Sequence, residues 1–402
     1  MENCAIRKVV LFDRVETFEN LLPITFTRPI SYIRVGIVTI REKWEAMLPG
    51  KYGVKSADFL CDYYKCDVEG DDETLFVDGS FVPDHKLVEA VGGLQTGQRL
   101  VNDDSQVIAY KGKDAEENGE DVVYSGETNS LKYVFDIFLL NGREIVNDYR
   151  RLTEGRESLP LPESNRVIGN YVDENGMPMI FIEEGAEVEG ATLNLKEGPI
   201  YIGKDSRVME GSCVRGPLAV CEGSQVRMGA MIYKDTTLGP YCKAGGELSN
   251  VVMLGYSNKS HGGYLGNAVI GEWCNIGAGV NASNLKNDYS KIRIWNYVQR
   301  RFIHTDLQFC GLIMGDHSKI GVNCMLNTAT VLGVGVNVHG SGFPRVFVPS
   351  FSEGSASGGF SDVSLKKFFD IAVRVMDRRH HDISEGERRV YEHVYAISQH
   401  HK

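Results

Sequence analysis

The sequence lacks an excess of basic residues, a long apolar run and a signal-type N-terminus, and each absence excludes a class of partner or location. Forty-three Lys and Arg against 54 Asp and Glu give a net charge of -11, which argues against nucleic acid, because phosphate backbones bind basic surfaces. No segment approaches the roughly 18 consecutive apolar residues of a membrane span, and the N-terminus has no apolar signal-peptide core. The 9 cysteines are scattered and odd in number, which favours free thiols in a reducing compartment. We therefore expect a cytoplasmic protein with no nucleic-acid or membrane partner.

What the sequence does contain is a six-residue repeat of apolar positions. The repeat has two series, which are Ile202, Val208, Val214, Val220, Val226, Ile232 and Leu238, then Met314, Ile320, Leu326, Leu332 and Val338. A period of six fits neither an α-helix nor an alternating strand. It is typical of a parallel β-helix, in which each hexad forms one face of a three-sided coil and its aliphatic residue points inward.

The regions on either side of the repeat have different patterns. Residues 1–165 show the mixed pattern of an α/β domain, in which Leu131–Leu140 has helical spacing and stops at Asn141-Gly142. Residues 166–345 form the repeat region, and residues 346–402 contain a Ser- and Gly-rich linker followed by two amphipathic helices. The expected fold is an α/β N-terminal domain, a left-handed parallel β-helix and C-terminal helices.

Two irregular stretches interrupt the repeat. The six-residue spacing is lost between Ala244 and Leu265, and the polar segment from Asn284 to Gly311 has no hexad pattern. Such an insertion must leave the β-helix as a loop, and long loops in compact folds are usually functional. The alternative is a solvated loop with spare charges.

A run of residues that starts within the first irregular stretch and continues beyond it has a recognisable order. It contains His-Gly-Gly-Tyr-Leu-Gly-Asn from His261, Asn-Ile-Gly-Ala-Gly from Asn275 and then an Asn-led loop at Asn284. This order and spacing resemble the acetyltransferase half of the bifunctional N-acetylglucosamine-1-phosphate uridyltransferase/glucosamine-1-phosphate acetyltransferase family. The chain is still more similar to a bacterial branch in which a shortened nucleotidyltransferase-like domain precedes the β-helix.

The resemblance implies roles for individual residues. His261 is implied to be the general base, because an amine that attacks a thioester must lose a proton and neutral imidazole can accept it near pH 7. The other implied site residues are Tyr264 and Asn275 against the sugar and acetyl groups, Ala278 and Gly279 beside the thioester, and Asn284 at the start of the loop. Backbone amides from Asn275 to Gly279 are candidate oxyanion donors. Asn275 has an alternative role in an asparagine ladder of the β-helix.

Arg227 resembles an arginine that holds the sugar phosphate, a task suited to a bidentate guanidinium. Met228 follows it where the family has proline, and the family's phosphate-binding lysine has no clear counterpart. Ser249, Asn250 and Lys259 are the nearby options. The alternative for Arg227 is an exposed corner residue.

The N-terminal domain departs further from the family pattern. The first strand is followed by no glycine, so the loop that wraps a triphosphate is missing. A Pro-x-Thr run survives and leads to Arg28, the nucleotide-binding candidate, but Ile30 follows Pro29 where the family has lysine. Asp78 is the candidate Mg²⁺ ligand, or else an ordinary turn residue. The domain thus resembles a degenerate nucleotidyltransferase.

The resemblance implies an acetyl-CoA-dependent N-acetyltransferase that acts on an amino-sugar phosphate such as glucosamine 1-phosphate, in nucleotide-sugar synthesis. Family members are homotrimers with the CoA groove between neighbouring β-helices. A second, nucleotidyltransferase activity would require Mg²⁺. The alternative is a non-catalytic nucleotide-sugar binding or regulatory protein that keeps both folds.

Overall fold

The computed structural model describes residues 7–65 and 68–401, which divide into two compact units. The first unit comprises residues 1–33, 38–136 and 385–393, and the second comprises residues 34–37, 137–384 and 394–402. In the described ranges, no helix is long and apolar enough to cross a membrane.

The first unit is built on a six-stranded mixed sheet of order β2-β1-β3-β6-β5-β7. Its strands are β1 Lys8–Phe12, β2 Lys51–Lys55, β3 Leu75–Asp78, β5 Gln98–Val101, β6 Val107–Lys111 and β7 Glu120–Val123. It also contains a two-stranded antiparallel sheet and five short α-helices, namely β4 Phe81–Val82, β8 Asn129–Ser130, α1 Val15–Asn20, α2 Ile40–Met47, α3 Asp58–Cys61, α4 His85–Gly92 and α5 Ala115–Asn118. Since β1 and β3 are parallel neighbours, their carboxyl ends meet at one edge of the sheet.

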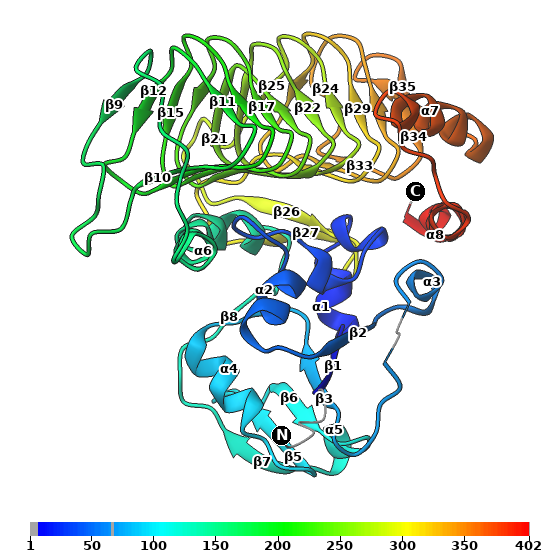
Figure 1. Cartoon of the computed structure of the whole chain (residues 1–402). Helices are drawn as coiled ribbons and strands as arrows, with labels where there is room; N and C mark the ends of the chain where they lie inside the picture. Colours follow the sequence, from blue (N-terminus) through cyan, green and yellow to red (C-terminus); the bar gives the residue numbers. More distant parts are fainter. Residues whose placement is uncertain (1–6, 66–67, 402) are drawn as a thin grey trace. The chain divides into compact units, whose positions relative to one another are not determined.

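The second unit is a left-handed parallel β-helix, here called the prism, whose coils stack along one axis (Figure 1). Its first face is β10 Ile180–Ile182, β13 Ile200–Ile202, β16 Leu218–Val220, β19 Thr236–Leu238, β28 Ile313–Met314, β31 Val331–Leu332 and β33 Phe347–Val348. Its second face is β11 Glu187–Val188, β14 Arg207–Val208, β17 Gln225–Val226, β20 Lys243–Ala244, β22 Asn258–Lys259, β24 Asn275–Ile276, β29 Lys319–Ile320, β32 Asn337–Val338, β34 Ser352–Ser355 and β35 Gly359–Asp362. Its third face is β9 Arg166–Ile168, β12 Thr192–Asn194, β15 Cys213–Arg215, β18 Met231–Ile232, β25 Asn281–Ala282 and β30 Met325–Leu326.

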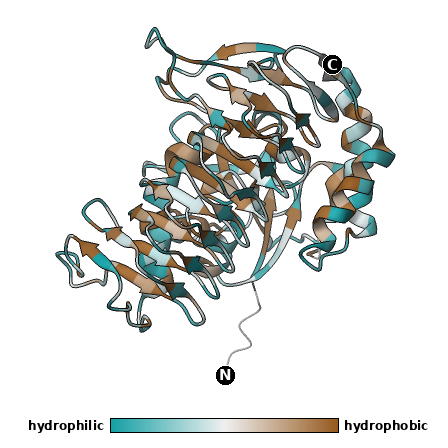
Figure 2. Ribbon diagram, turned by 90° about the horizontal axis from the view of Figure 1, so that it is seen from above, coloured by the Kyte–Doolittle hydropathy of each residue, from teal (hydrophilic) through white to brown (hydrophobic). Residues whose placement is uncertain are grey.

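The interior of the prism confirms the six-residue repeat. Every hexad residue from Ile202 to Leu238 and from Met314 to Val338 is at most 2% exposed and belongs to one continuous apolar core. Hydrophobic colour accordingly concentrates on the strands of the prism, while many of the connecting turns are hydrophilic (Figure 2).

The loss of the six-residue spacing between Ala244 and Leu265 has a simple structural cause. β21 (Glu247–Gly255) and β23 (Tyr264–Glu272) each run across the third and first faces without a break. Asn250 and Asn267 bend these strands with φ of 54° and 46°, a left-handed conformation that asparagine adopts more readily than most residues. The corner is therefore made inside a strand, and the six-residue spacing shifts.

The helix expected at Leu131–Leu140 is longer and starts later. Helix α6 spans Asp136–Thr153 and continues through Asn141-Gly142, which the sequence suggested as its end. Gly142 lies at a close approach, because a Cβ atom there would lie 2.0 Å from Asp235 Oδ1 and the Asp235 side chain would have to move. Packing against the prism thus overrides the usual helix-ending tendency of Asn-Gly.

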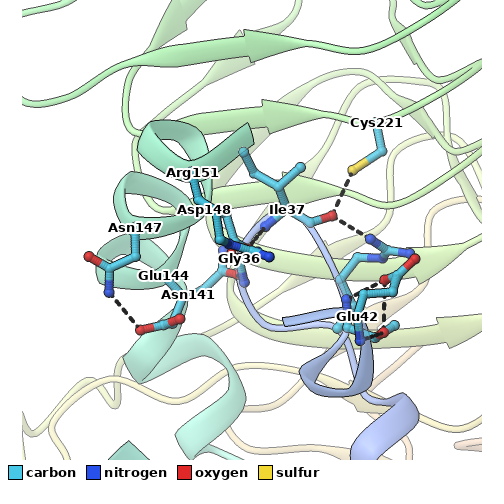
Figure 3. A network of polar contacts seen from close by, with 11 residues as sticks. Gly36, Ile37, Glu42, Asn141, Glu144, Asn147, Asp148, Arg151 and Cys221 are labelled. Atoms are coloured by element: carbon cyan, nitrogen blue, oxygen red, sulfur yellow. Dashed lines mark hydrogen bonds and ion pairs between the residues drawn. The ribbon is translucent and has the colours of Figure 1, made fainter. Parts of the chain in front are cut away.

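Residues 34–37 are bound into the second unit by polar contacts (Figure 3). The backbone nitrogens of Gly36 and Ile37 each donate over 2.8 Å, to Asn141 Oδ1 and Asp148 Oδ2. The Ile37 carbonyl accepts from Cys221 Sγ at 3.5 Å. This short segment therefore joins α6 and the prism although it lies more than a hundred residues earlier in the chain.

Two segments that were expected to be a loop and a linker contain β-strands. The insertion from Asn284 to Gly311 contains an antiparallel hairpin, β26 Arg293–Asn296 and β27 Arg301–His304. Its Trp295 stacks on Phe347 of the first face with ring centroids 4.3 Å apart, so the hairpin returns to the prism. Residues 345–361, expected as a linker, carry β33, β34 and most of β35 and extend the prism.

The two C-terminal helices were expected and are present as α7 Leu365–Asp377 and α8 Glu385–Ser398. Ser364 caps α7 by accepting from the Lys367 backbone nitrogen, and Phe368, Ala372 and Met376 form its buried face. Phe368 packs edge-on against Phe351 of the prism, with centroids 5.0 Å apart.

Candidate active site

The second face of the prism forms the floor of a cavity of about 790 Å³. Strand register aligns one outward-facing residue from each successive coil, and this row is Lys243, Asn258, Asn275, Lys319 and Asn337. The end of α7 supplies the opposite wall through Val375, Arg378 and Arg379. A single chain therefore builds both walls, whereas the resemblance led us to expect a groove between neighbouring prisms.

Three of the residues implied by the resemblance line this cavity together: His261, Asn275 and Ala278. His261 is exposed in the turn after β22, and Asn275 begins the second-face strand of the next coil. The Gly279 backbone nitrogen donates to the Gly262 carbonyl over 2.9 Å, which connects the turn of Ala278 to the turn of His261. Gly279 itself is not among the cavity-lining residues.

Tyr264 and Asn284 lie together, but not at the cavity. Asn284 Nδ2 donates to Asn267 Oδ1 over 2.8 Å, and Asn267 in turn contacts Asn250, so the asparagine ladder of this β-helix is Asn250–Asn267–Asn284 and Asn275 is outside it. The Tyr264 hydroxyl contacts Asn284, and burial raises the pKa of Tyr264 above its ordinary value. These side chains support the corner beside the turn of His261.

Cationic side chains converge on the same cavity. Burial and the nearby charges of Arg379, Arg227 and Arg378 lower the pKa of Lys243. Arg227 is a corner residue that donates to Gln225 Oε1 over 3.1 Å and does not line the cavity. Like charges gathered around a cavity favour a bound anion, because only a counter-charge relieves their repulsion.

Lys319 contributes less to the positive charge around the cavity than its position suggests. Its ammonium group donates to the carbonyls of Trp273 and His317 over 2.8 and 2.9 Å, and burial lowers its pKa to about 8. The cations of the cavity with the greatest freedom to meet a ligand are therefore Lys243, Arg378 and Arg379. We did not expect these from the sequence, which carries no motif around them.

An aromatic column fixes α7 beside the cavity. Tyr241, Tyr256, Trp273 and His317 occupy successive corners with φ between 52° and 59°, and their rings stack with centroids 4.2 to 6.2 Å apart. His381, just beyond α7, packs edge-on against Tyr256 and Trp273. Arg379 Nη2 also donates to Asn258 Oδ1 over 3.1 Å. These contacts hold the arginine pair at the cavity wall.

The N-terminal unit has a different arrangement at the edge where β1 and β3 end. Asp78 Oδ1 accepts from the nitrogen and hydroxyl of Ser80, and its Oδ2 accepts from Arg14 Nε over 2.9 Å. Arg28 is only 3% exposed and donates to the Ile24 carbonyl over 3.2 Å. In the described ranges, no three His, Cys, Asp or Glu side chains gather as metal ligands would. The residues present do not fit Mg²⁺, because Arg14 already neutralises Asp78.

Asp13 lies at the same edge as Asp78. Its carboxylate accepts from Ser56 and from the Ile30 backbone nitrogen, yet burial together with the charge of Asp78 raises the pKa of Asp13 to about 7. A carboxyl group with a folded pKa above its unfolded value binds its proton more tightly in the folded state. The stability it contributes is complete below about pH 4 and is lost as pH rises through about 7.

We therefore expect the Asp13→Asn variant to unfold at a higher temperature than the wild type at pH 8, by about 5 °C, and at nearly the same temperature at about pH 4, below which the contribution of Asp13 is complete. Asparagine keeps an acceptor oxygen for Ile30 while removing the charge. Thermal unfolding followed by circular dichroism at both pH values measures this difference. The exposed Asp103→Asn variant is the control, and an Asp13→Asn variant less stable than wild type at pH 8 contradicts the prediction.

Comparisons with known proteins match parts of the chain. Residues 9–157 match the family model described as sugar nucleotidyl transferase. Among curated proteins, the chain is similar to the bifunctional protein GlmU of Trichodesmium erythraeum (strain IMS101), with 29% identity over 143 residues. That match covers 34% of this chain and only 25% of the relative, so the chain spans about a quarter of the curated protein it matches.

The solved structures that match this chain include two acyltransferases. A UDP-N-acetylglucosamine acyltransferase of Francisella novicida is 11% identical with a TM-score of 0.30, and the match covers 60% of this chain and 75% of that one. An N-acyltransferase of Bacillus cereus, solved with dTDP and coenzyme A, is 12% identical with a TM-score of 0.23, and the match covers 48% and 92%. At these scores neither structure adds to the assignment. Residues 9–157 are therefore similar to the sugar nucleotidyl transferase family, and a third of the chain is similar to part of GlmU.

Proposed function

We propose that the chain is an acetyl-CoA-dependent N-acetyltransferase whose acceptor is an amino-sugar phosphate such as glucosamine 1-phosphate. One observation carries the proposal. His261, Asn275 and Ala278, which a short sequence match singles out, line one cavity with the cations Lys243, Arg378 and Arg379. A base, an amide and an anion-binding wall are the groups that acetyl transfer from a phosphorylated thioester carrier requires.

In the proposed mechanism, the His261 imidazole accepts the proton that the sugar amine loses as it attacks the thioester carbonyl. The tetrahedral intermediate then expels the thiolate, and the proton on His261 is available to the leaving sulfur. A general base of this kind contributes a rate factor of about 10² to 10⁴. His261 is exposed in its turn, so its ring can be reached by a substrate.

Most backbone amides of this turn are already hydrogen-bonded, so the oxyanion of that intermediate needs another donor. The backbone nitrogens of Asn275, Gly277 and Gly279 donate to Ser318, Ile320 and Gly262, at 3.1, 2.8 and 2.9 Å, and are used by the coil. The expectation that backbone amides from Asn275 to Gly279 form the oxyanion hole is therefore wrong for these three. We assign the oxyanion to the Asn275 side-chain amide, which faces the cavity.

The cations divide naturally between the two substrates in this proposal. Arg378 and Arg379, immediately after α7, bind the phosphates of CoA as charge-assisted donors together with Lys243 on the floor. Arg227, at the corner beyond the cavity, is assigned to the phosphate of the acceptor sugar. Tyr264 and Asn284 then act through the corner that they support rather than by touching substrate.

The proposal is tested by mixing the pure protein with acetyl-CoA and a panel of amino-sugar phosphates while thiol release is followed. Thiol release that depends on both glucosamine 1-phosphate and the protein supports the acetyltransferase. A wild-type protein that releases no thiol with any acceptor contradicts it and favours the second candidate, a binding or regulatory protein. Light scattering tests the homotrimer that the resemblance implies.

A specific observation argues against a second activity in the first unit. Arg14 occupies Asp78 at the position where the resemblance would require a Mg²⁺ ligand. We therefore expect no pyrophosphate when the protein is incubated with UTP, Mg²⁺ and N-acetylglucosamine 1-phosphate. Pyrophosphate formed at a rate comparable with thiol release would contradict this prediction.

A further inference from the structure

The second face of the prism has one charged residue among its inward-facing positions. The inward positions of successive coils are Val188, Val208, Val226, Ala244, Lys259, Ile276, Ile320 and Val338. Lys259 therefore replaces an aliphatic residue of the repeat, and its exposure is 0%. An ammonium group inside an apolar core is costly unless it is fully hydrogen-bonded, so its presence needs an explanation beyond packing.

The ammonium group of Lys259 is satisfied by backbone carbonyls alone. It donates to the carbonyl of His261 over 2.6 Å, to that of Gly262 over 3.1 Å and to that of Gly245, in the preceding coil, over 3.4 Å. Ala244 is the neighbouring inward residue in that coil, and its small side chain leaves room for the lysine. The side chain thus curls under the turn that carries His261.

Backbone hydrogen bonds hold the far side of that turn, because the Gly262 carbonyl accepts from the Gly279 nitrogen over 2.9 Å and the Gly263 carbonyl accepts from the Glu247 nitrogen over 3.0 Å. The His261 carbonyl accepts from Lys259 Nζ. His261 is followed by Gly262 and Gly263, and a side chain at Gly262 would meet nothing within 4 Å. Paired glycines allow many backbone conformations, so the direction of the His261 side chain depends on what holds the peptide units next to it. Lys259 binds the carbonyls of the two peptide units that follow His261.

The same contacts connect the turn of the proposed base with a second turn of the prism. The Gly262 carbonyl accepts from Lys259 Nζ and also from the Gly279 nitrogen, in the turn that carries Ala278. One carbonyl therefore links the turn of the proposed base with the turn beside the proposed thioester. A displacement of that carbonyl would move both turns relative to each other.

From this geometry we infer that Lys259 is a positioning residue for acetyl transfer: its buried ammonium group clamps the His261-Gly262 turn and sets the imidazole over Asn275 and Ala278. This inference rests on the proposed function. Lys259 touches no substrate, and it does not replace the phosphate-binding lysine of the resembling family, because its ammonium group is enclosed by the carbonyls of the turn. Burial lowers the pKa of Lys259 to about 8, as expected for a cation without an acidic partner.

Lys259→Met is the informative variant, because methionine is close in length and suits an inward position of an aliphatic column. We expect kcat for thiol release to fall about a hundredfold, the scale of a misplacement near 1 Å, while KM for acetyl-CoA changes less than about twofold. The unfolding temperature should change by only a few degrees, because the removal of a buried charge offsets part of the cost of leaving the carbonyls of Gly245, His261 and Gly262 without their donor. A merely structural lysine would lower stability and leave the kinetic constants of the folded fraction unchanged.

The control is Lys204→Met, which removes an exposed lysine from the same prism and should change neither kinetics nor stability. A Lys259→Met variant with kcat within about threefold of wild type overturns the inference. So does failure of both Lys259→Met and Lys259→Gln to fold, because Lys259 would then hold the fold and not the base. The NMR resonance of the His261 ring should shift in Lys259→Met, a readout that needs no turnover. An inactive wild type refutes the proposed function, whereas an unshifted His261 resonance refutes only the clamp.

Discussion

Replacement of His261 by alanine is expected to lower kcat for thiol release by about 10² to 10⁴-fold, with little change in KM for acetyl-CoA. The imidazole is the proposed proton acceptor, and it lines the cavity without forming its floor or its cationic wall. Removal of the ring therefore takes away a group that acts in the transition state and leaves the binding of the CoA phosphates intact. The measurement is steady-state thiol release at saturating glucosamine 1-phosphate.

Two matched changes sharpen the test of His261. His261→Gln keeps a polar side chain of similar reach but cannot accept the proton, so it should be nearly as inactive as His261→Ala. His339→Ala removes a histidine from the same face of the prism, outside the cavity, and should be fully active. If His261→Ala retains more than about a third of wild-type kcat, the assignment of the base is wrong, although the acetyltransferase itself would stand.

The second large effect is expected from the arginine pair of α7. The double variant Arg378→Gln/Arg379→Gln should raise KM for acetyl-CoA at least about a hundredfold, since each charge-assisted contact is worth about 1.5 to 3 kcal/mol. Its kcat at saturation should stay within a few-fold of wild type, because these residues bind phosphates remote from the thioester. The wild-type KM should also rise with salt, and that dependence should be weaker in the variant.

Arg374→Gln is the control for the pair, because Arg374 is exposed on the same helix and does not line the cavity. Loss of the Arg379 contact to Asn258 could loosen α7, so Lys243→Gln provides an independent arm on the floor of the cavity. It should raise KM for acetyl-CoA without affecting the helix. Unchanged KM in both variants would contradict an anion site at this cavity.

The sequence was sufficient to predict the prism because its signal is local. Each inward residue from Ile202 to Leu238 lies six positions from the next, and the spacing alone determines which side chains enter the core. His261, Asn275 and Ala278 were singled out by the family resemblance of a short run of sequence; they line one cavity, and their roles in catalysis stay predictions.

The rest of the site depends on contacts that no local pattern encodes. The amphipathic spacing of α7 predicts that Phe368 and Ala372 are buried, but it does not predict which surface buries them. Nothing in the sequence therefore indicated that Arg378 and Arg379 would lie at a cavity. Tyr264 and Asn284 belong to the same sequence resemblance as His261 but do not line the cavity, because an asparagine ladder takes up the Asn284 amide and the Tyr264 hydroxyl lies against Asn284. The prediction that Asp78 binds a metal could not be assessed from the sequence, because it depends on Arg14, which only the folded sheet brings next to Asp78.

The polar contacts of residues 34–37 bear on how this protein can be dissected and how it could have evolved. The chain enters the prism unit with four residues, returns to the first unit for about a hundred, and later contributes part of α8 to the first unit again. No single cut separates two self-sufficient halves. A fragment that begins after α6 would leave Cys221 and Thr237 without the partners that Ile37, Gly36 and Asn141 provide. The two units are therefore interleaved along the chain, so a recombination event at one junction would divide one of them instead of exchanging it whole.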